Sequence, residues 1–304
     1  MTSSFSVGEL CRAGVLARTP AWVWLLGPYL LLLAATLLLP LTNLAVISVF
    51  RHNPNTMWVA EPTLANYTRL LDAYYVQVLM RTLRIGFITT ISCLLLGTPL
   101  AYWLARCSRR TLAIGLFFIF MPMMVSTVIR AFGWMILLGR NGIINQASVE
   151  IGIGRWLYVM NTETAVIIAL IQICLPLMVL PAMGTIEKIP LSLEEAATNL
   201  GAGPFALFYR VVLPLSLPGL ASGALLAFVV AISVVVTPAL MGGRTDRMIG
   251  NEIYDQVLTA LNWPFASAMA IILIVLVVLL LCVSLWLAGR IGSWLVGPAV
   301  AARA

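Results

Sequence analysis

The most informative part of this chain is Glu187–Pro218, which reads EKIPLSLEEAATNLGAGPFALFYRVVLPLSLP. Local rules predict two short helices within it. Ser192 can cap the first helix, and Glu195, three residues later, can close a capping box. Gly201 is well placed to end that helix, because glycine adopts the left-handed conformation of a helix C-terminus without strain. Small or apolar side chains recur at i, i+3, i+4 and i+7 and form one face: Leu193, Ala196, Ala197 and Leu200.

A second helix is predicted directly after Gly201. Pro204 suits the first position of a helix, where the missing N–H has no partner to lose. The same spacing then repeats with larger side chains, at Phe205, Phe208, Tyr209 and Val212. Pro214 and Pro218 are expected to end this helix. The stretch is therefore predicted to be a rigid helix–turn–helix with one small-residue face and one aromatic face.

Two amphipathic helices of this kind could simply lie on lipid headgroups. A lipid-surface helix usually carries Lys and Arg on its polar face, however, whereas the first helix carries Glu194 and Glu195 and no basic residue. The small side chains of Ala196 and Ala197 also permit close backbone approach. These features favour insertion into a groove on a partner protein.

Long apolar segments flank this stretch on both sides. Of the 304 residues, 62% are hydrophobic and only 10% are charged, which is too little charge to cover the surface of a soluble domain. Six segments are long enough to cross about 30 Å of hydrocarbon and lack the alternation of a β-barrel. They are residues 22–49, 84–105, 112–138, 164–186, 216–241 and 266–289. The predicted fold class is an all-α membrane protein with six transmembrane helices.

Six spans place both termini on the same side of the membrane. With the termini inside, nine basic residues fall on each side, so the total count does not decide the orientation. Arg106, Arg109 and Arg110 share the tightest loop, and Arg12 and Arg18 precede the first segment. Because the rule is strongest for short loops and for the flanks of the first helix, we expect cytoplasmic termini.

This orientation fixes the expected domain organisation. A cytoplasmic leader spans residues 1–21, a transmembrane domain spans 22–289, with the helix–turn–helix at about 187–217, and a cytoplasmic tail spans 290–304. In the first outer loop, Asn66 to Leu79 is expected to form a helix along the membrane surface.

Other kinds of chemistry find little support in the sequence. The net charge of +7 comes from scattered arginines and the single Lys188, without the basic patch expected of a nucleic-acid binder. His52 is the only histidine and no two cysteines have CxxC spacing, so no metal site and no disulfide framework is predicted. No GxxxxGK[ST] pattern occurs, so ATP hydrolysis by this chain is not expected and no catalytic residue is assigned.

The residues of the helix–turn–helix resemble a known family motif. Glu195-Ala196-Ala197, three residues, Gly201, nine residues, and then Val211-x-Leu213-Pro214 are similar to the EAA loop of binding-protein-dependent ABC importer permeases, with Val211 in place of the usual isoleucine. Other stretches are similar to the spermidine/putrescine branch of that family, in the expected order. They are Gly97 to Tyr102, Leu138 to Asn145, Met241 to Gly243, Met248 to Tyr254, and Asn262 to Pro264.

The resemblance implies a type I importer in a bacterial inner membrane. This chain would act with two ATPase subunits that bind ATP and Mg, with a second and different permease chain, and with an external solute-binding protein, while itself binding no cofactor. The loop between the fourth and fifth helices would form cytoplasmic coupling helices that convert ATPase closure into alternating access. The implied coupling residues are Glu194, Glu195, Ala196, Ala197, Gly201, Leu213 and Pro214.

The translocation path is less visible in the sequence. Arg130 is the ionisable residue deepest in an apolar segment, which marks it as a functional candidate or as a side chain that snorkels to the interface. Trp134 and Gln172 are further candidates for the path, although interface anchoring and helix packing account for them equally well.

The substrate class stays open at this point. No Asp or Glu lies in the six predicted spans, and residues 231–238 lack the acidic residue that commonly precedes the proline of this segment in polyamine permeases. A polyamine, an amino-acid derivative and a phosphonate are therefore all candidate substrates. A secondary transporter is the main alternative function, but it would usually show repeat symmetry and carboxylates within the spans.

Overall fold

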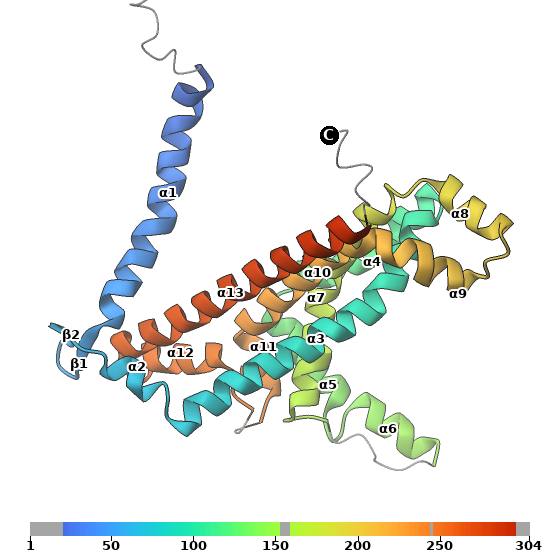
Figure 1. Cartoon of the computed structure of the whole chain (residues 1–304). Helices are drawn as coiled ribbons and strands as arrows, with labels where there is room; N and C mark the ends of the chain where they lie inside the picture. The colour runs from blue at the N-terminus through green and yellow to red at the C-terminus, as the bar shows by residue number, and fades with distance from the viewer. Residues whose placement is uncertain (1–20, 153–158, 244–245, 296–304) are drawn as a thin grey trace, which may run out of the picture.

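The computed structural model of the chain describes residues 21–152, 159–243 and 246–295 (Figure 1). The elements follow in this order: α1 (Ala21–Ser48), β1 (Phe50–Asn53), β2 (Met57–Pro62), α2 (Ala65–Arg69), α3 (Ala73–Arg106), α4 (Arg109–Met124), α5 (Thr127–Leu138), α6 (Ile143–Glu150), α7 (Glu163–Ile186), α8 (Leu191–Asn199), α9 (Pro204–Leu207), the π-helical turn η1 (Phe208–Val212), α10 (Leu213–Ser233), α11 (Val236–Met241), α12 (Ile249–Leu258) and α13 (Trp263–Leu295). Within these residues, five helices are long and apolar enough to cross a membrane, and the count is six where the bent pair formed by α4 and α5–α6 is taken as one span. The predicted helical membrane fold is confirmed, with a short β-hairpin in addition.

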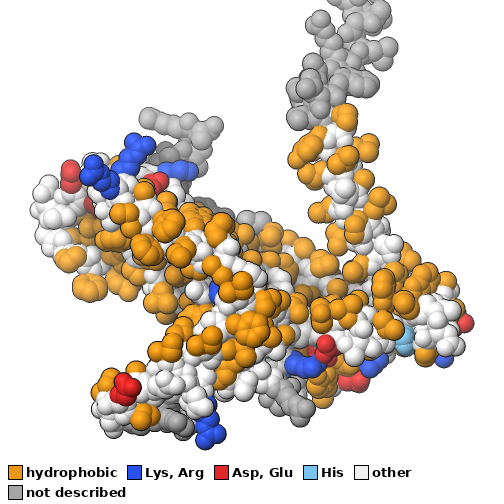
Figure 2. All heavy atoms as spheres, turned by 180° about the vertical axis from the view of Figure 1, so that it is seen from behind, with side chains coloured by type: hydrophobic (Ala, Val, Ile, Leu, Met, Phe, Trp, Pro, Cys, Tyr) orange, Lys and Arg blue, Asp and Glu red, His pale blue; other side chains and the backbone are white. Residues whose placement is uncertain are grey.

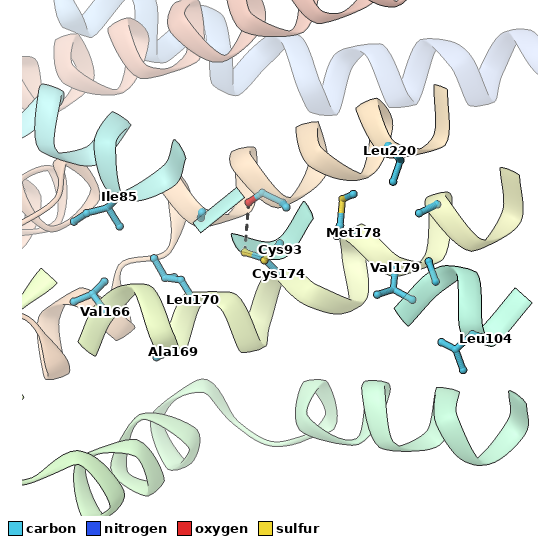
Figure 3. Packing of buried hydrophobic residues seen from close by; sticks show 14 of the residues in the cluster. Ile85, Cys93, Leu104, Val166, Ala169, Leu170, Cys174, Met178, Val179 and Leu220 are labelled. Atoms are coloured by element: carbon cyan, nitrogen blue, oxygen red, sulfur yellow. Dashed lines mark hydrogen bonds between the residues drawn. The ribbon is translucent and has the colours of Figure 1, made fainter. Parts of the chain in front are cut away.

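The core is a layer of three long helices, α3, α7 and α10 (Figure 3). Glycines let α7 and α10 approach closely: a Cβ added at Gly219 would lie 2.0 Å from Thr185 Oγ1, and one added at Gly223 would lie 2.8 Å from the backbone oxygen of Met178. Buried Cys174 of α7 donates a hydrogen bond to the backbone oxygen of Ala227 in α10, at 3.4 Å. Because small residues permit backbone contact where lipid gives no hydrophobic drive, these helices form one closely packed body.

The third predicted span, residues 112–138, is not a single straight helix. Helix α4 ends at Met124, Val125 and Ser126 are extended, and the chain resumes as α5 after a bend of 100°. Pro122 lies in the last turn of α4, where it cannot donate a helical hydrogen bond. The prediction of one continuous helix here was wrong because hydropathy records length and apolarity but not the direction of the backbone.

The fifth predicted span, residues 216–241, is also broken. Helix α10 ends at Ser233 and the short α11 begins at Val236. Pro238 accounts for the break, because it has no N–H to donate to the carbonyl of Val234 and its ring would clash there. The carbonyl of Val235, at the break, accepts from the backbone N–H of Ala239 at 3.2 Å and from the side-chain amide of Asn251 at 2.9 Å. Asn251 thus joins α12 to the break between α10 and α11.

The expected surface helix over 66–79 does not form as one helix. Helix α2 ends at Arg69, and after a turn α3 begins at Ala73, eleven residues before the predicted start of the second span. Asn66 ties α2 to the end of α1, because its buried side-chain amide donates to the carbonyls of Ser48 and Phe50, at 2.8 and 2.9 Å. These bonds hold α2 below the end of α1 and direct the chain into α3.

Helix α1 stands away from the body and contacts it mainly at one end, beside α13 (Figure 1). None of the residues in its most apolar stretch is buried within this chain. Figure 2 shows hydrophobic side chains over α1 and over the middle of the molecule, with charged side chains gathered toward the ends. This distribution is typical of a protein that is covered by hydrocarbon or by another membrane chain.

The two terminal regions lie largely outside the described residues. The predicted leader, with Arg12 and Arg18, is one of them, and only the first part of the predicted tail is described, as the end of α13.

Candidate functional site

The helix–turn–helix lies at one end of the body, where α8 and α9 project beyond the long helices (Figure 1). Gly201 has φ +85° and lies just past the end of α8, as predicted from its position. Pro204 occupies the first turn of α9, also as predicted. The conformation of this turn and the start of α9 were therefore predicted correctly from the sequence.

Two details of this loop differ from the prediction. Ser192 does not cap α8, because Pro190, with φ −60° and ψ 132°, is the N-cap and starts the helix at Leu191. Pro214 and Pro218 do not end the second helix, which continues from Pro204 to Ser233. The widened π turn η1 precedes Pro214, and in such a turn carbonyls bond five residues onward, so a residue without an N–H is tolerated.

The two adjacent glutamates of α8 differ in their exposure to solvent. Glu194 is buried, with 8% of its surface exposed, whereas Glu195 is exposed. Arg106, in the last turn of α3, donates from Nε and Nη2 to Oε1 of Glu194, at 2.9 and 2.5 Å. Tyr102, one turn earlier, donates from its hydroxyl to Oε2 of Glu194, at 3.0 Å. Glu194 therefore binds within this chain, and Glu195 is the carboxylate available to a partner.

Arg106 makes two further contacts. Its Nη2 donates to the carbonyl of Ile186, the last residue of α7, at 3.2 Å, and to the carbonyl of Ile189 at 3.0 Å. A cation is favoured at a helix C-terminus, where carbonyls lack intrahelical partners. We call these contacts of Arg106, with Glu194, Ile186 and Ile189, the Arg106 bridge.

Several apolar side chains of α8, α9 and η1 are exposed in the described structure, and two of them, Phe205 and Tyr209, also line a cavity beside α3. The most exposed are Leu200, at 90%, and Phe205, at 80%. Leu191, Leu193 and Tyr209 are also exposed. Ala196 is exposed beside them, Ala197 is half-buried, and Leu213 and Pro214 are half-buried where the loop joins α10. We call this face the α8–α9 surface. An exposed apolar patch on a rigid element is typical of a protein-binding site.

The three path candidates do not form one site. Trp134 of α5 donates from Nε1 to Oε1 of Gln172 in α7, at 2.7 Å, so these two side chains join their helices. Arg130 turns back toward the α4–α5 break and donates to Thr127 Oγ1, at 3.3 Å. Its buried Nε atom has no hydrogen-bond partner within the described structure.

A cavity of about 480 Å³ lies at the opposite end of the long helices from α8, among α5, α11 and α12. Val128 and Phe132 of α5 line one side, and Val235 lines it at the α10–α11 break. Tyr254 and Asp255 of α12 line the other side. We call this space the α5–α12 cavity. It lies beside both helix breaks, and discontinuous helices commonly line substrate sites in membrane transporters.

The two charged side chains that line this cavity, Arg247 and Asp255, pair with each other. Arg247 also pairs, at 3.5 Å, with Glu252, which is buried outside the cavity lining and accepts from the hydroxyl of Tyr74 at 2.8 Å. The hydrogen bond to Asp255 raises the pKa of Arg247, so the arginine stays charged. Acidic side chains thus border the membrane-spanning helices without lying in them. The spacing of Ile249, Ile253 and Val257 could have revealed α12, which was assigned to a loop.

Comparison with known proteins agrees with this architecture. The family described as "Binding-protein-dependent transport system inner membrane component" matches residues 85–293. The chain is 38% identical over 244 residues to the spermidine/putrescine transport system permease protein PotB of Haemophilus influenzae, covering 79% of this chain and 85% of that protein. It is 39% identical over 230 residues to PotB of Escherichia coli, covering 75% of this chain and 83% of that protein.

Among solved structures, the fold is similar to a chain of a bacterial alginate ABC transporter in complex with an alginate pentasaccharide-bound periplasmic protein. The TM-score is 0.74 at 18% identity, and the match covers 90% of this chain and 96% of that one. The family match and the structural match both extend over most of the described helices. The chain therefore belongs to the family of binding-protein-dependent transport system inner membrane components.

Proposed function

We propose that this permease couples ATP hydrolysis by partner subunits to polyamine import, and that the α8–α9 surface is its contact with the ATPase. The exposed apolar side chains of α8 and α9 carry this proposal, since they lie on a short, rigid loop that projects from the helical body. Small Ala196 leaves room for a partner's backbone beside α8, and Glu195 offers an exposed carboxylate next to it.

The coupling itself follows from rigidity. Two ATPase subunits, which hold ATP and Mg, close on ATP binding and displace α8. The left-handed turn at Gly201 fixes α8 relative to α9, and α9 continues without interruption into α10. Displacement of the loop therefore rotates the long helices and exchanges an inward-open for an outward-open cavity. In this arrangement the α8–α9 surface and both termini are cytoplasmic.

The proposed cargo is a polyamine. Two relatives more than a third identical to this chain are named as spermidine/putrescine permeases. The α5–α12 cavity supports a cationic cargo, because its lining combines the carboxylate of Asp255 with the aromatic rings of Phe132 and Tyr254, which attract cations. A solute-binding protein would deliver the polyamine at this end, and a second, different permease chain would complete the path.

The experiment is to purify the chain with its ATPase, second permease and solute-binding protein and to measure ATP hydrolysis with a panel of solutes. The panel contains spermidine, putrescine, an amino-acid derivative and a phosphonate. We expect stimulation by a polyamine that is lost in Gly201→Val, because a β-branched side chain does not tolerate φ +85°. Stimulation by the phosphonate alone would overturn the cargo assignment. Failure of any ATPase to associate would overturn the coupling role and favour a secondary transporter.

A further inference from the structure

The Arg106 bridge joins elements that are far apart in the sequence. Arg106 belongs to α3, its carboxylate partner Glu194 lies 88 residues later in α8, and its carbonyl partners lie at the end of α7. The Arg106 and Glu194 side chains are only 19% and 11% exposed, so solvent screens this pair little. One guanidinium thus connects the projecting loop to two of the three core helices.

The geometry of the bridge suits an arginine in particular. The guanidinium presents its N–H groups in a fixed planar fork, so that Nε and Nη2 both reach Glu194 while Nη2 also reaches two carbonyls. Tyr102 holds the second carboxylate oxygen, and its ring packs edge-on against Phe208 of η1, with centroids 5.7 Å apart. The last turns of α3 therefore hold both helices of the loop.

Few other contacts fix α8 to the body. Its main packing neighbours are α9 and η1, which belong to the same loop, and most of its residues are exposed. Helices α3 and α7, by contrast, pack along their length and are also joined at their opposite end, where Glu163 pairs with Arg81, at 3.2 Å, and with Arg84. A displacement of α8 can reach α3 and α7 directly through the Arg106 bridge.

We infer that Arg106 is a positioning residue for coupling, which makes α8 move with α3 and α7 as one body. This inference rests on the proposed function of the α8–α9 surface. It also assigns the two glutamates separate tasks, with Glu195 facing the ATPase and Glu194 anchoring α8 from within. Loss of the bridge leaves the ATPase contact intact but lets α8 shift without moving the core.

The test replaces the buried pair by apolar residues of similar length, in the double variant Arg106→Met/Glu194→Met. Removing both charges together avoids leaving one buried and unpaired, so assembly of the complex is expected to survive. The readouts, in vesicles containing the complete complex, are ATP hydrolysis and spermidine uptake. We expect hydrolysis to continue while spermidine imported per ATP falls roughly fivefold or more, within the range of typical coupling energies.

Arg110→Gln is the control for loss of an arginine from this region, because Arg110 is exposed at the same end of the molecule. Its transport per ATP should equal that of wild type. A double variant that also transports as much per ATP as wild type would overturn the inference. If the double variant fails to assemble, Arg106→Lys decides, since lysine keeps the charge but not the fork: reduced coupling supports the bridge, and unchanged coupling overturns it.

If the proposed function is wrong, hydrolysis and uptake by the wild-type complex itself show it. A wild-type complex that hydrolyses ATP but imports no polyamine contradicts the cargo, and the same ratio is then measured with the panel solute that stimulates hydrolysis most. A wild-type complex without ATP-driven uptake of any panel solute overturns the proposed function, and with it this inference.

Discussion

Gly201 is the residue on which the conformation of the loop depends most directly. An added Cβ there would meet no atom within 4 Å, so only the backbone angle, φ +85°, restricts the side chain. Asparagine tolerates this conformation, whereas a β-branched residue does not. We expect Gly201→Asn to retain most ATP-driven uptake and Gly201→Val to lose it, with both variants inserted in the membrane. Equal uptake by the two variants would contradict the role of the turn.

The two glutamates of α8 should differ in their effect on stability. Glu194→Gln leaves Arg106 buried without its anion, and breaking a buried pair costs about 3 kcal/mol. Glu195→Gln changes an exposed side chain and should leave stability unchanged while weakening ATPase binding. Thermal unfolding of the purified chain and co-purification of the ATPase measure the two effects. If Glu195→Gln is the more destabilising change, the assignment of Glu194 as the buried anchor of α8 is wrong.

Asp255 offers a residue-scale test of the cargo. Asp255→Asn removes the carboxylate that lines the α5–α12 cavity, and we expect the half-saturating spermidine concentration to rise roughly tenfold, as loss of one charge-assisted contact implies. Asp72→Asn is the control, because Asp72 is exposed near the same end and makes no side-chain cap bond. Equal uptake kinetics of the two variants would exclude Asp255 from the path.

At the scale of elements, the contact between α7 and α10 should tolerate no side chain at Gly219. A Cβ there would lie 2.5 Å from the backbone oxygen of Pro181, so the helices must separate. We expect Gly219→Ala to lower the free energy of unfolding by about 1–3 kcal/mol, the usual cost of overpacking. Gly184→Ala, in α7 but with nothing within 4 Å, should be near neutral. Chemical denaturation in detergent compares the two variants.

For these elements, the sequence predicted the features that depend only on neighbouring residues. The turn at Gly201, the start of α9 at Pro204 and the approximate extent of the spans depend on neighbouring residues alone, and they were predicted correctly. The breaks after Met124 and Ser233 were missed, because a sum of hydropathy does not register a change in backbone direction. The continuation of the helix past Pro214 depends on η1, a widened turn that no local rule predicts.

Contacts between distant segments could not be predicted at all. In the sequence, Arg106 is one of three arginines in a short loop, and only the packing of α3 against α7, from whose end the loop with α8 begins, brings it to Glu194. The α5–α12 cavity likewise joins residues of α5 with residues of α12, more than a hundred positions later. Of the path candidates, the structure brings Trp134 to Gln172 of α7, whereas Arg130 bonds to Thr127 of its own helix.

At the scale of the whole molecule, the uncovered surfaces indicate that this chain does not act alone. Helix α1 buries none of its most apolar stretch within the chain, and the α8–α9 surface is open at one end. The proposed complex covers these surfaces with lipid, a second permease and an ATPase. The central claim is that α8 converts ATPase closure into movement of the long helices, and this claim requires the complete complex.

The most direct test is uptake of spermidine into vesicles that contain the chain, its second permease and its ATPase. We predict uptake that requires ATP and the solute-binding protein, that persists when ionophores collapse ion gradients, and that stops in Gly201→Val while ATP hydrolysis continues. Uptake that proceeds without the ATPase and stops when the ion gradients are collapsed would contradict the account and identify a secondary transporter.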